Sequence, residues 1–233
     1  MIQALVIPPL MSSPRKTLVL ACLWAVFGTA LFGKVGLPSP QSTEGFIAHL
    51  LINETPFPGE RAYRSETDTK RAMESILNVL VSRLVFVPVP YRQVEVAAVQ
   101  TDNILDIITA GGVRGQVDGF YRASNGRLTM VARVTERTDH LLGIANSGQP
   151  GRFARLMNHA VTVSTEYTRR PTIPYDPYAR LTVIHNVPVT GRAYSWMTDQ
   201  SFYHPGGNFV RIPDSSQGAH GGNRFFSLGS NPK

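Results

Sequence analysis

The chain has 233 residues, of which 42% are hydrophobic, 17% charged and 9% aromatic. This is the composition of a globular protein, and it excludes a collagen-like, disordered or polytopic membrane protein. The single cysteine, Cys22, excludes a disulfide framework or a cysteine-rich metal cluster within the chain. The formal net charge is +7, yet residues 37–168 hold thirteen basic and thirteen acidic side chains. Because a nucleic-acid groove needs clustered basic residues, we expect no nucleic-acid partner.

Residues 1–36 are predicted to form a targeting segment. Arg15 and Lys16 precede an uncharged stretch, Thr17–Gly33, which Lys34 ends. A basic region followed by an apolar run is typical of export signals. The run is shorter than the ~20 residues of a membrane-spanning helix, so we expect either a signal peptide or an N-terminal membrane anchor; a buried core helix is the alternative. The protein is therefore predicted to be exported to the periplasm or cell envelope, with possible anchoring at the inner membrane.

Residues 37–41 are predicted to be a linker, and residues 42–168 a helical catalytic core. Apolar residues recur at helical spacing, and Ser, Thr and Asp residues stand where N-caps are expected. Thr101-Asp102 is the predicted cap of the third helix, and a loop, Val113–Gly126, follows it. The predicted helices run from Ser42 or Thr43 to about Glu54, from Ser65 to about Leu84, and over Asn103–Ala110, Val134–Asn146 and Pro150–Tyr167.

Residues 169–233 are rich in Pro, Gly, Tyr, Asn and Ser and are predicted to be an irregular, β-containing part of the same domain. Short β-like pieces occur at Arg180–Ile184, Asn208–Ile212 and Arg224–Leu228. The predicted fold class is therefore mainly α (α+β), with a helical core and a few short strands in the C-terminal third.

Glu54 is the most informative polar residue. It follows Leu50 by four residues and Ile47 by seven, which places its carboxylate on the apolar face at the end of a helix. Burial and the negative end of the helix dipole both disfavour the charged form and raise the pKa. A raised pKa suits a general acid near neutral pH. The alternative is a partly exposed glutamate that pairs with Arg61 or Arg64.

The loop Gly115-Gln116-Val117-Asp118-Gly119-Phe120-Tyr121 is the second candidate site. Its glycines allow a close approach to a ligand, while Gln116, Asp118 and Tyr121 offer polar contacts and a ring on which a sugar can stack. An ordinary hairpin turn is the alternative. Asp118 is also a candidate for the second carboxylate of a glycosidase pair.

No metal site or cofactor is expected. The six histidines show no metal-ligand spacing, and the chain has no G-x-S-x-G motif. Its Gly111-Gly112-Val113-Arg114-Gly115 run matches neither a Walker nor a Rossmann pattern.

Four segments, in this order along the chain, resemble the SleB-type spore cortex-lytic enzymes and cell wall hydrolases. Leu51-Ile52-Asn53-Glu54 resembles the end of that family's first helix. Leu77-Asn78-Val79-Leu80 with Ser82-Arg83 resembles its "VLNRV" helix. Gly115-Gln116-Val117 followed by Asn125-Gly126-Arg127 resembles its "GQF…(D/N)GR" segment. The family's closing strand, "G-x-H-x-F(Y/F)", resembles Gly222-Asn223-Arg224-Phe225-Phe226, with Arg224 at the position of the histidine.

The resemblance implies a lysozyme-like fold and cleavage of peptidoglycan between N-acetylmuramic acid and N-acetylglucosamine. It implies that Glu54 is the catalytic acid and that Gln116 binds substrate; from the residues themselves, Gly115, Asp118 and Tyr121 are further candidates for substrate binding. A lytic transglycosylase, with one glutamate as acid and then base, is the predicted activity, and peptidoglycan glycan strands are the predicted partner. The alternative is a non-catalytic exported envelope module that binds glycan or a partner protein.

Overall fold

A computed structural model describes residues 34–148, 151–170, 175–198 and 204–230. The predicted targeting segment lies almost wholly outside these ranges. Residues 35–233 form one compact unit, distinct from residues 1–34. Helices and small antiparallel sheets both occur in this unit, which confirms the α+β class. The helices are α2 (Thr43–Glu54), α3 (Glu66–Val85), α4 (Gln93–Ala97), α5 (Ile104–Thr109), α6 (Ala132–Asn146) and α7 (Arg152–Arg169), with short 3₁₀ turns at Gly112–Arg114 and Asp214–Ser216.

The first two helices begin at the predicted caps. The Ser42 hydroxyl accepts a hydrogen bond from the Gly45 N–H at 3.1 Å, and the Ser65 hydroxyl accepts one from the Asp68 N–H at 3.1 Å. Such bonds satisfy backbone donors that the first helical turn leaves without partners.

The predicted cap of α5 is wrong by one residue. Asn103, not Thr101-Asp102, caps this helix, because its side-chain oxygen accepts from the Leu105 N–H at 2.9 Å. The Thr101 hydroxyl instead donates to Asp106 at 2.9 Å. Helix α4 was not predicted, and the predicted start of α7 at Pro150 lies outside the described residues.

Helix α2 is the centre of the helical core. The sequence predicted one apolar face, but every residue from Gly45 to Ile52 is buried. Helices α3, α6 and α7 all pack against α2, so no side of it is left to water. A helix that is hydrophobic all round is typical of such a central position. The end of α2, at Glu54, is therefore the point where the chain leaves the core.

The predicted loop Val113–Gly126 contains regular structure. Strands β1 (Phe120–Arg122) and β2 (Leu128–Met130) form an antiparallel hairpin in which Tyr121 lies opposite Thr129. The Phe120 ring is fully buried and meets Phe46 of α2 edge to face, with 5.3 Å between ring centroids. The hairpin is thus attached to the core by an aromatic pair that periodicity did not reveal.

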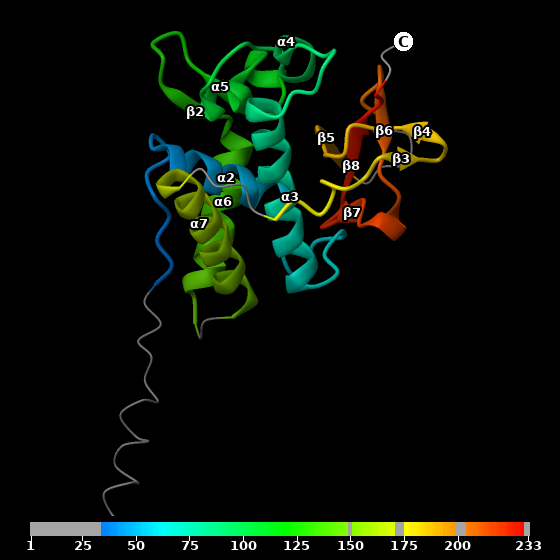
Figure 1. Cartoon of the computed structure of the whole chain (residues 1–233). Coiled ribbons are helices and arrows are strands. Elements are labelled where there is room, and N and C mark those ends of the chain that lie inside the picture. The colour runs from blue at the N-terminus through cyan, green and yellow to red at the C-terminus, as the bar shows by residue number, and fades with distance from the viewer. Residues whose placement is uncertain (1–33, 149–150, 171–174, 199–203, 231–233) are drawn as a thin grey trace, which may run out of the picture. The chain divides into compact units, whose positions relative to one another are not determined.

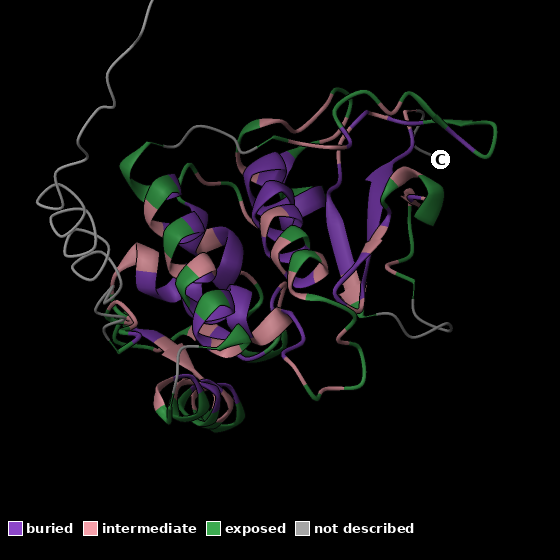
Figure 2. Ribbon diagram, turned by 90° about the horizontal axis from the view of Figure 1, so that it is seen from below, coloured by how far each residue is buried: buried purple, intermediate pink, exposed green. Residues whose placement is uncertain are grey.

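The C-terminal part forms a small sheet beside α3. Its path is β5 (Ser195–Thr198), β8 (Asn223–Leu228), β6 (Phe209–Arg211), with β7 (Ala219–His220) also paired to β8; β3 (Val183–Ile184) and β4 (Val187–Pro188) form a separate hairpin. Every residue of β8 is buried (Figure 2). Helix α3 contacts both β5 and β7, and it lies between helices α2, α6 and α7 and this sheet (Figure 1).

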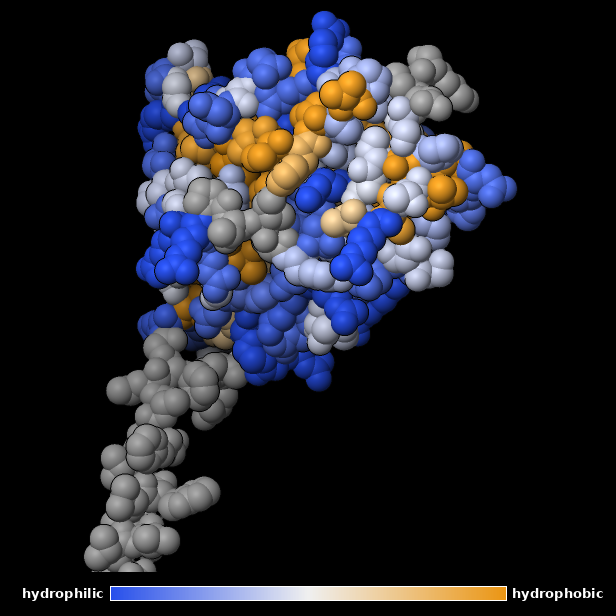
Figure 3. Space-filling model, in the orientation of Figure 1, coloured by the Kyte–Doolittle hydropathy of each residue, from blue (hydrophilic) through white to orange (hydrophobic). Residues whose placement is uncertain are grey.

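The surface is unevenly hydrophobic. On the face drawn in Figure 3, hydrophobic residues gather in the upper part, whereas the lower part is mostly hydrophilic. Exposed large apolar side chains near α4 include Val85, Val89 and Val94. Among the described residues, no helix is both long enough and apolar enough to cross a membrane.

Candidate functional site

The position of Glu54 is determined by two chain segments far apart in the sequence. Glu54 is the last residue of α2, and its backbone carbonyl accepts a hydrogen bond from the Asn223 side-chain amide at 2.7 Å. Asn223 begins β8 and is buried. The Thr55 hydroxyl donates to the Leu51 carbonyl at 2.7 Å, which satisfies another acceptor of the last turn. The strand β8 thereby holds the C-terminal end of the central helix.

The Glu54 carboxyl group is held at one oxygen only. The Trp196 indole N–H donates to Oε2 at 2.9 Å, and Oε1 has no hydrogen-bond partner among the described residues. Burial raises the pKa of this carboxyl, although the Trp196 hydrogen bond and the charges of Arg133 and Arg137 oppose the rise. The direction that the sequence predicted is confirmed, with burial as the main cause.

The predicted alternative, an ion pair of Glu54 with Arg61 or Arg64, does not occur. None of the ion pairs among the described residues includes Glu54. Glu54 therefore combines a raised pKa with an oxygen that has no partner among the described residues, and both properties suit a proton donor.

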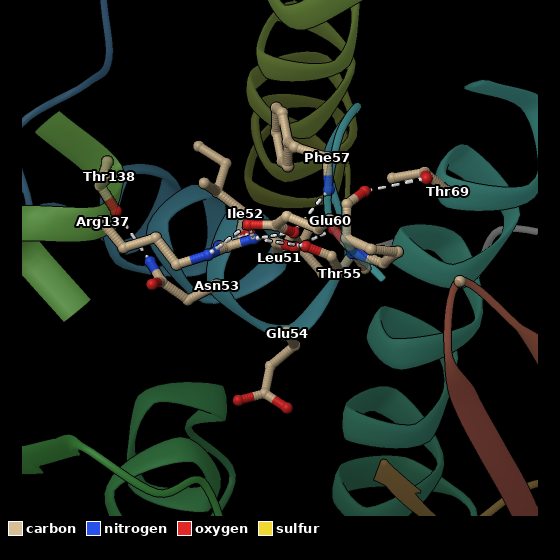
Figure 4. Close-up of polar contacts among 12 residues, drawn as sticks. Leu51, Ile52, Asn53, Glu54, Thr55, Phe57, Glu60, Thr69, Arg137 and Thr138 are labelled. Atoms are coloured by element: carbon tan, nitrogen blue, oxygen red, sulfur yellow. Dashed lines mark hydrogen bonds and ion pairs between the residues drawn. The ribbon is translucent and has the colours of Figure 1, made fainter. Parts of the chain in front are cut away.

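Arg137, from α6, fixes the backbone on either side of Glu54. Its guanidinium donates to the Ile52 carbonyl at 2.6 Å and to the Thr55 carbonyl at 2.9 Å, and it pairs with the Glu60 carboxylate at 2.8 Å. Glu60 in turn accepts from the Phe57 N–H at 2.7 Å. The Glu54 side chain points away from this cluster (Figure 4). Arg137 and Glu60 thus hold the turn after α2 without occupying the carboxyl group.

Glu54 lines a cleft at the end of α2. This cleft has a volume of about 1020 Å³. It is lined by the end of α2, the turn that follows it, Arg137 and the start of β8: Asn53, Glu54, Thr55, Pro56, Glu60, Arg61, Ala62, Arg64, Arg137, Thr198, Gly221, Gly222 and Asn223. A volume of this size fits an extended ligand such as two or more sugar rings.

Gln116 is connected to Glu54 through two buried side chains. Arg83, from α3, donates to the Gln116 side-chain oxygen at 2.8 Å and to the Tyr194 carbonyl at 2.6 Å. Its guanidinium carbon lies 5.5 Å from the centre of the Trp196 ring, which holds Glu54. Because Arg83 takes the oxygen of the Gln116 amide, the Nε2 donor, which has no partner among the described residues, remains available to a ligand.

Arg83 is itself an unusual residue for a helix in the core. Only 4% of it is exposed, and burial lowers its pKa to about 10. It remains a cation at neutral pH, with both of its hydrogen-bond partners uncharged. The cation is attracted to the face of the Trp196 ring, 5.5 Å away, while its hydrogen bonds hold it in place.

None of the predicted loop residues, Gln116 included, lines the described cleft; of the predicted site residues only Glu54 does. Asp118 is exposed and forms an ion pair with Arg133 at 2.5 Å, although its charge contributes to raising the pKa of Glu54. Tyr121 is half-buried in β1, opposite Thr129. Gly115 has a backbone reason for being glycine, because a Cβ there would collide with the Ala110 carbonyl oxygen.

The residues that support Glu54 were not predicted from the sequence. Trp196 and Asn223 are more than 140 positions from Glu54 along the chain, and no local pattern links them to it. Asn223 and Arg83 do occur within the motifs that resemble the hydrolase family. Their presence there is the one signal that pointed to them.

No group of three or more His, Cys, Asp or Glu side chains suited to a metal ion occurs in the described part of the chain. Comparison of the chain with protein-family models, curated proteins and solved structures finds no significant match.

Proposed function

We propose that the protein is a peptidoglycan-cleaving enzyme, a lytic transglycosylase that uses Glu54 as its single acid and base. The observation that carries the proposal is the Glu54 carboxyl group: burial raises its pKa, Trp196 holds one oxygen, and the other is free beside a large cleft. The resemblance of four ordered motifs to cell wall hydrolases supports the same activity. On this proposal, the helical core around α2 corresponds to a lysozyme-like fold.

The reaction begins with protonated Glu54. Its free oxygen donates a proton to the glycosidic oxygen between N-acetylmuramic acid and N-acetylglucosamine as the bond to the anomeric carbon breaks. The 6-hydroxyl of the muramoyl residue then attacks that carbon, and ionised Glu54 takes the hydroxyl proton. The product carries a 1,6-anhydro ring, no water is consumed, and Glu54 returns to its starting state.

The surroundings of Asp118 favour this route over hydrolysis with two carboxylates. A glycosidase pair needs a second carboxylate that is free to act on water or on the anomeric carbon. Asp118 is instead exposed and paired with Arg133. An internal hydroxyl as nucleophile removes the need for such a partner.

Gln116 has the chemistry of a substrate-positioning residue. Its amide donor is available, and Arg83 fixes the orientation of the amide. An amide donor of this kind suits the carbonyl oxygen of an N-acetyl group. The predicted export signal fits an enzyme that meets its substrate in the periplasm or cell envelope.

The test is cleavage of purified sacculi by the parent protein, by Glu54→Gln and by Glu136→Gln. Glu136 is an exposed residue of α6 and serves as a matched control. Loss of a general acid should lower the rate by about 10²–10⁴-fold, whereas Glu136→Gln should retain activity. Activity retained in Glu54→Gln would contradict the proposal. Binding of sacculi without any cleavage by the parent would favour a glycan-binding envelope module instead.

A further inference from the structure

One wall of the cleft carries positive charge beside Glu54. Arg61 and Arg64 both line the cleft, and both are exposed. Arg61 makes no ion pair or hydrogen bond through its side chain among the described residues. An arginine that faces a ligand-sized space without a partner is available to bind an anion.

The chain segment that carries these arginines is held in place. Glu60 is fixed by Arg137 and by the Phe57 N–H, and the Tyr63 N–H donates to the Glu60 carbonyl at 3.0 Å. On its other side, Ala62 packs against Gly222 so closely that a Cβ at Gly222 would collide with it. Gly222 also has a φ of +67°, which a glycine tolerates in the tight turn between β7 and β8. The arginines therefore extend from an ordered backbone.

The acidic residues of the cleft do not neutralise Arg61. The cleft lining includes two carboxyl groups, Glu54 and Glu60. Glu60 is already paired with Arg137, and Glu54 is uncharged when it acts as an acid. Asp68, which follows on the chain, accepts from the Gly221 N–H at 2.9 Å and lies 3.6 Å from His220. The wall at Arg61 thus keeps a positive potential that attracts an anionic group.

We propose that Arg61, with Arg64 beside it, forms a subsite for a carboxylate of the stem peptides that peptidoglycan carries. This inference rests on the proposed function and specifies its substrate as peptide-bearing glycan. Each stem peptide is joined to the muramoyl residue whose glycosidic bond is cleaved, so its carboxylates enter the cleft together with that bond. Removal of the peptide by an amidase leaves a single lactyl carboxylate close to the ring of each muramoyl residue, whereas a stem peptide carries several carboxylates further from the ring. The subsite would therefore distinguish the two substrates.

The experiment measures binding of soluble glycan strands to the full chain in the Glu54→Gln background, where no turnover is needed. Strands with stem peptides are compared with strands from which an amidase has removed them. Removing the peptides should weaken binding about three- to tenfold, and Arg61→Glu should weaken binding of peptide-bearing strands by a similar factor. Arg127→Glu, the same charge change at an exposed residue outside the cleft lining, should leave binding unchanged.

Equal affinity for both kinds of strand, unchanged binding in Arg61→Glu, or no binding to either strand would each overturn the subsite. Its failure is distinguishable from failure of the proposed function, which is read from cleavage of sacculi by the parent protein. If the parent cleaves sacculi but Arg61→Glu binds peptide-bearing strands as well as the protein with Arg61 does, only the subsite proposal is refuted. If Arg61→Glu weakens binding but the parent does not cleave sacculi, only the proposed transglycosylase activity is refuted.

Discussion

Replacing Arg137 by methionine should destabilise the end of α2. Methionine keeps an unbranched side chain of similar reach but removes the guanidinium. The change removes the hydrogen bonds to the Ile52 carbonyl (2.6 Å) and the Thr55 carbonyl (2.9 Å). It also removes the ion pair with the Glu60 carboxylate (2.8 Å). Each of these acceptors must then find water or remain unsatisfied.

The magnitude follows from how far each bond is buried. A hydrogen bond from a charged donor contributes about 1.5–3 kcal/mol, but bonds that share one donor group do not add fully. The ion pair adds less, about 0.2–1 kcal/mol, because 26% of the Arg137 side chain and 37% of the Glu60 side chain are exposed. We therefore expect Arg137→Met to lower the free energy of unfolding by about 2–4 kcal/mol. Glu60→Gln, which spares the bonds to the two carbonyls, should cost less than about 1 kcal/mol.

The assay is guanidinium chloride unfolding followed by circular dichroism, with Arg127→Met as the control. Arg127 is exposed, so its replacement should change the free energy of unfolding by no more than about 0.5 kcal/mol. If Arg137→Met lowers the free energy of unfolding no more than the control does, the conclusion that Arg137 fixes the backbone around Glu54 is refuted. If Glu60→Gln lowers the free energy of unfolding as much as Arg137→Met does, the stabilisation comes from the ion pair and not from the hydrogen bonds to the two carbonyls.

Three further predictions follow from the pKa shifts. Trp196→Phe removes the hydrogen-bond donor that lowers the pKa of Glu54. The pH at which cleavage activity declines on the alkaline side should therefore be higher than in the parent. An unchanged alkaline decline in the pH–rate profile would argue against Glu54 as the titrating acid. Because the pKa of Glu54 is raised in the folded state, the folded protein loses stability as Glu54 ionises. Thermal unfolding should therefore show Glu54→Gln to be more stable than the parent at about pH 8 and equally stable at about pH 4. Arg155 and Lys70 lower the pKa of Glu66 to about 2, so its contribution is present at neutral pH and lost as the pH falls toward that value. Glu66→Gln should therefore cost less than about 1 kcal/mol at neutral pH and nothing in acid, and an equal cost at both would contradict the ion-pair explanation.

Helix boundaries were predictable where local chemistry determines them. Ser42 and Ser65 cap α2 and α3 because their side chains reach backbone donors only three residues away. The raised pKa of Glu54 was predictable for a similar reason, since its distance from Leu50 and Ile47 along one helix places it near the apolar core.

The partners of Glu54 were not predictable, because they depend on tertiary packing. Trp196 and Asn223 lie on β5 and β8, and the pairing of these strands determines where both side chains meet the end of α2. A hairpin turn was the alternative for residues 115–121, but the turn of the β1–β2 hairpin lies at residues 123–127. The two strands were not predicted because each has three residues, too few for an alternating pattern to be recognised. The short helix α4, Gln93–Ala97, was missed for the same reason.

The most direct test of the central claim is to digest sacculi with the parent protein in ¹⁸O-labelled water and to analyse the products by mass spectrometry. If Glu54 acts alone as acid and then base, the muropeptides should carry 1,6-anhydro ends, be lighter by one water than hydrolysis products and contain no ¹⁸O. Glu54→Gln should release none of them at a comparable rate. Incorporation of ¹⁸O at the reducing end would show that water is the nucleophile and would contradict the transglycosylase mechanism.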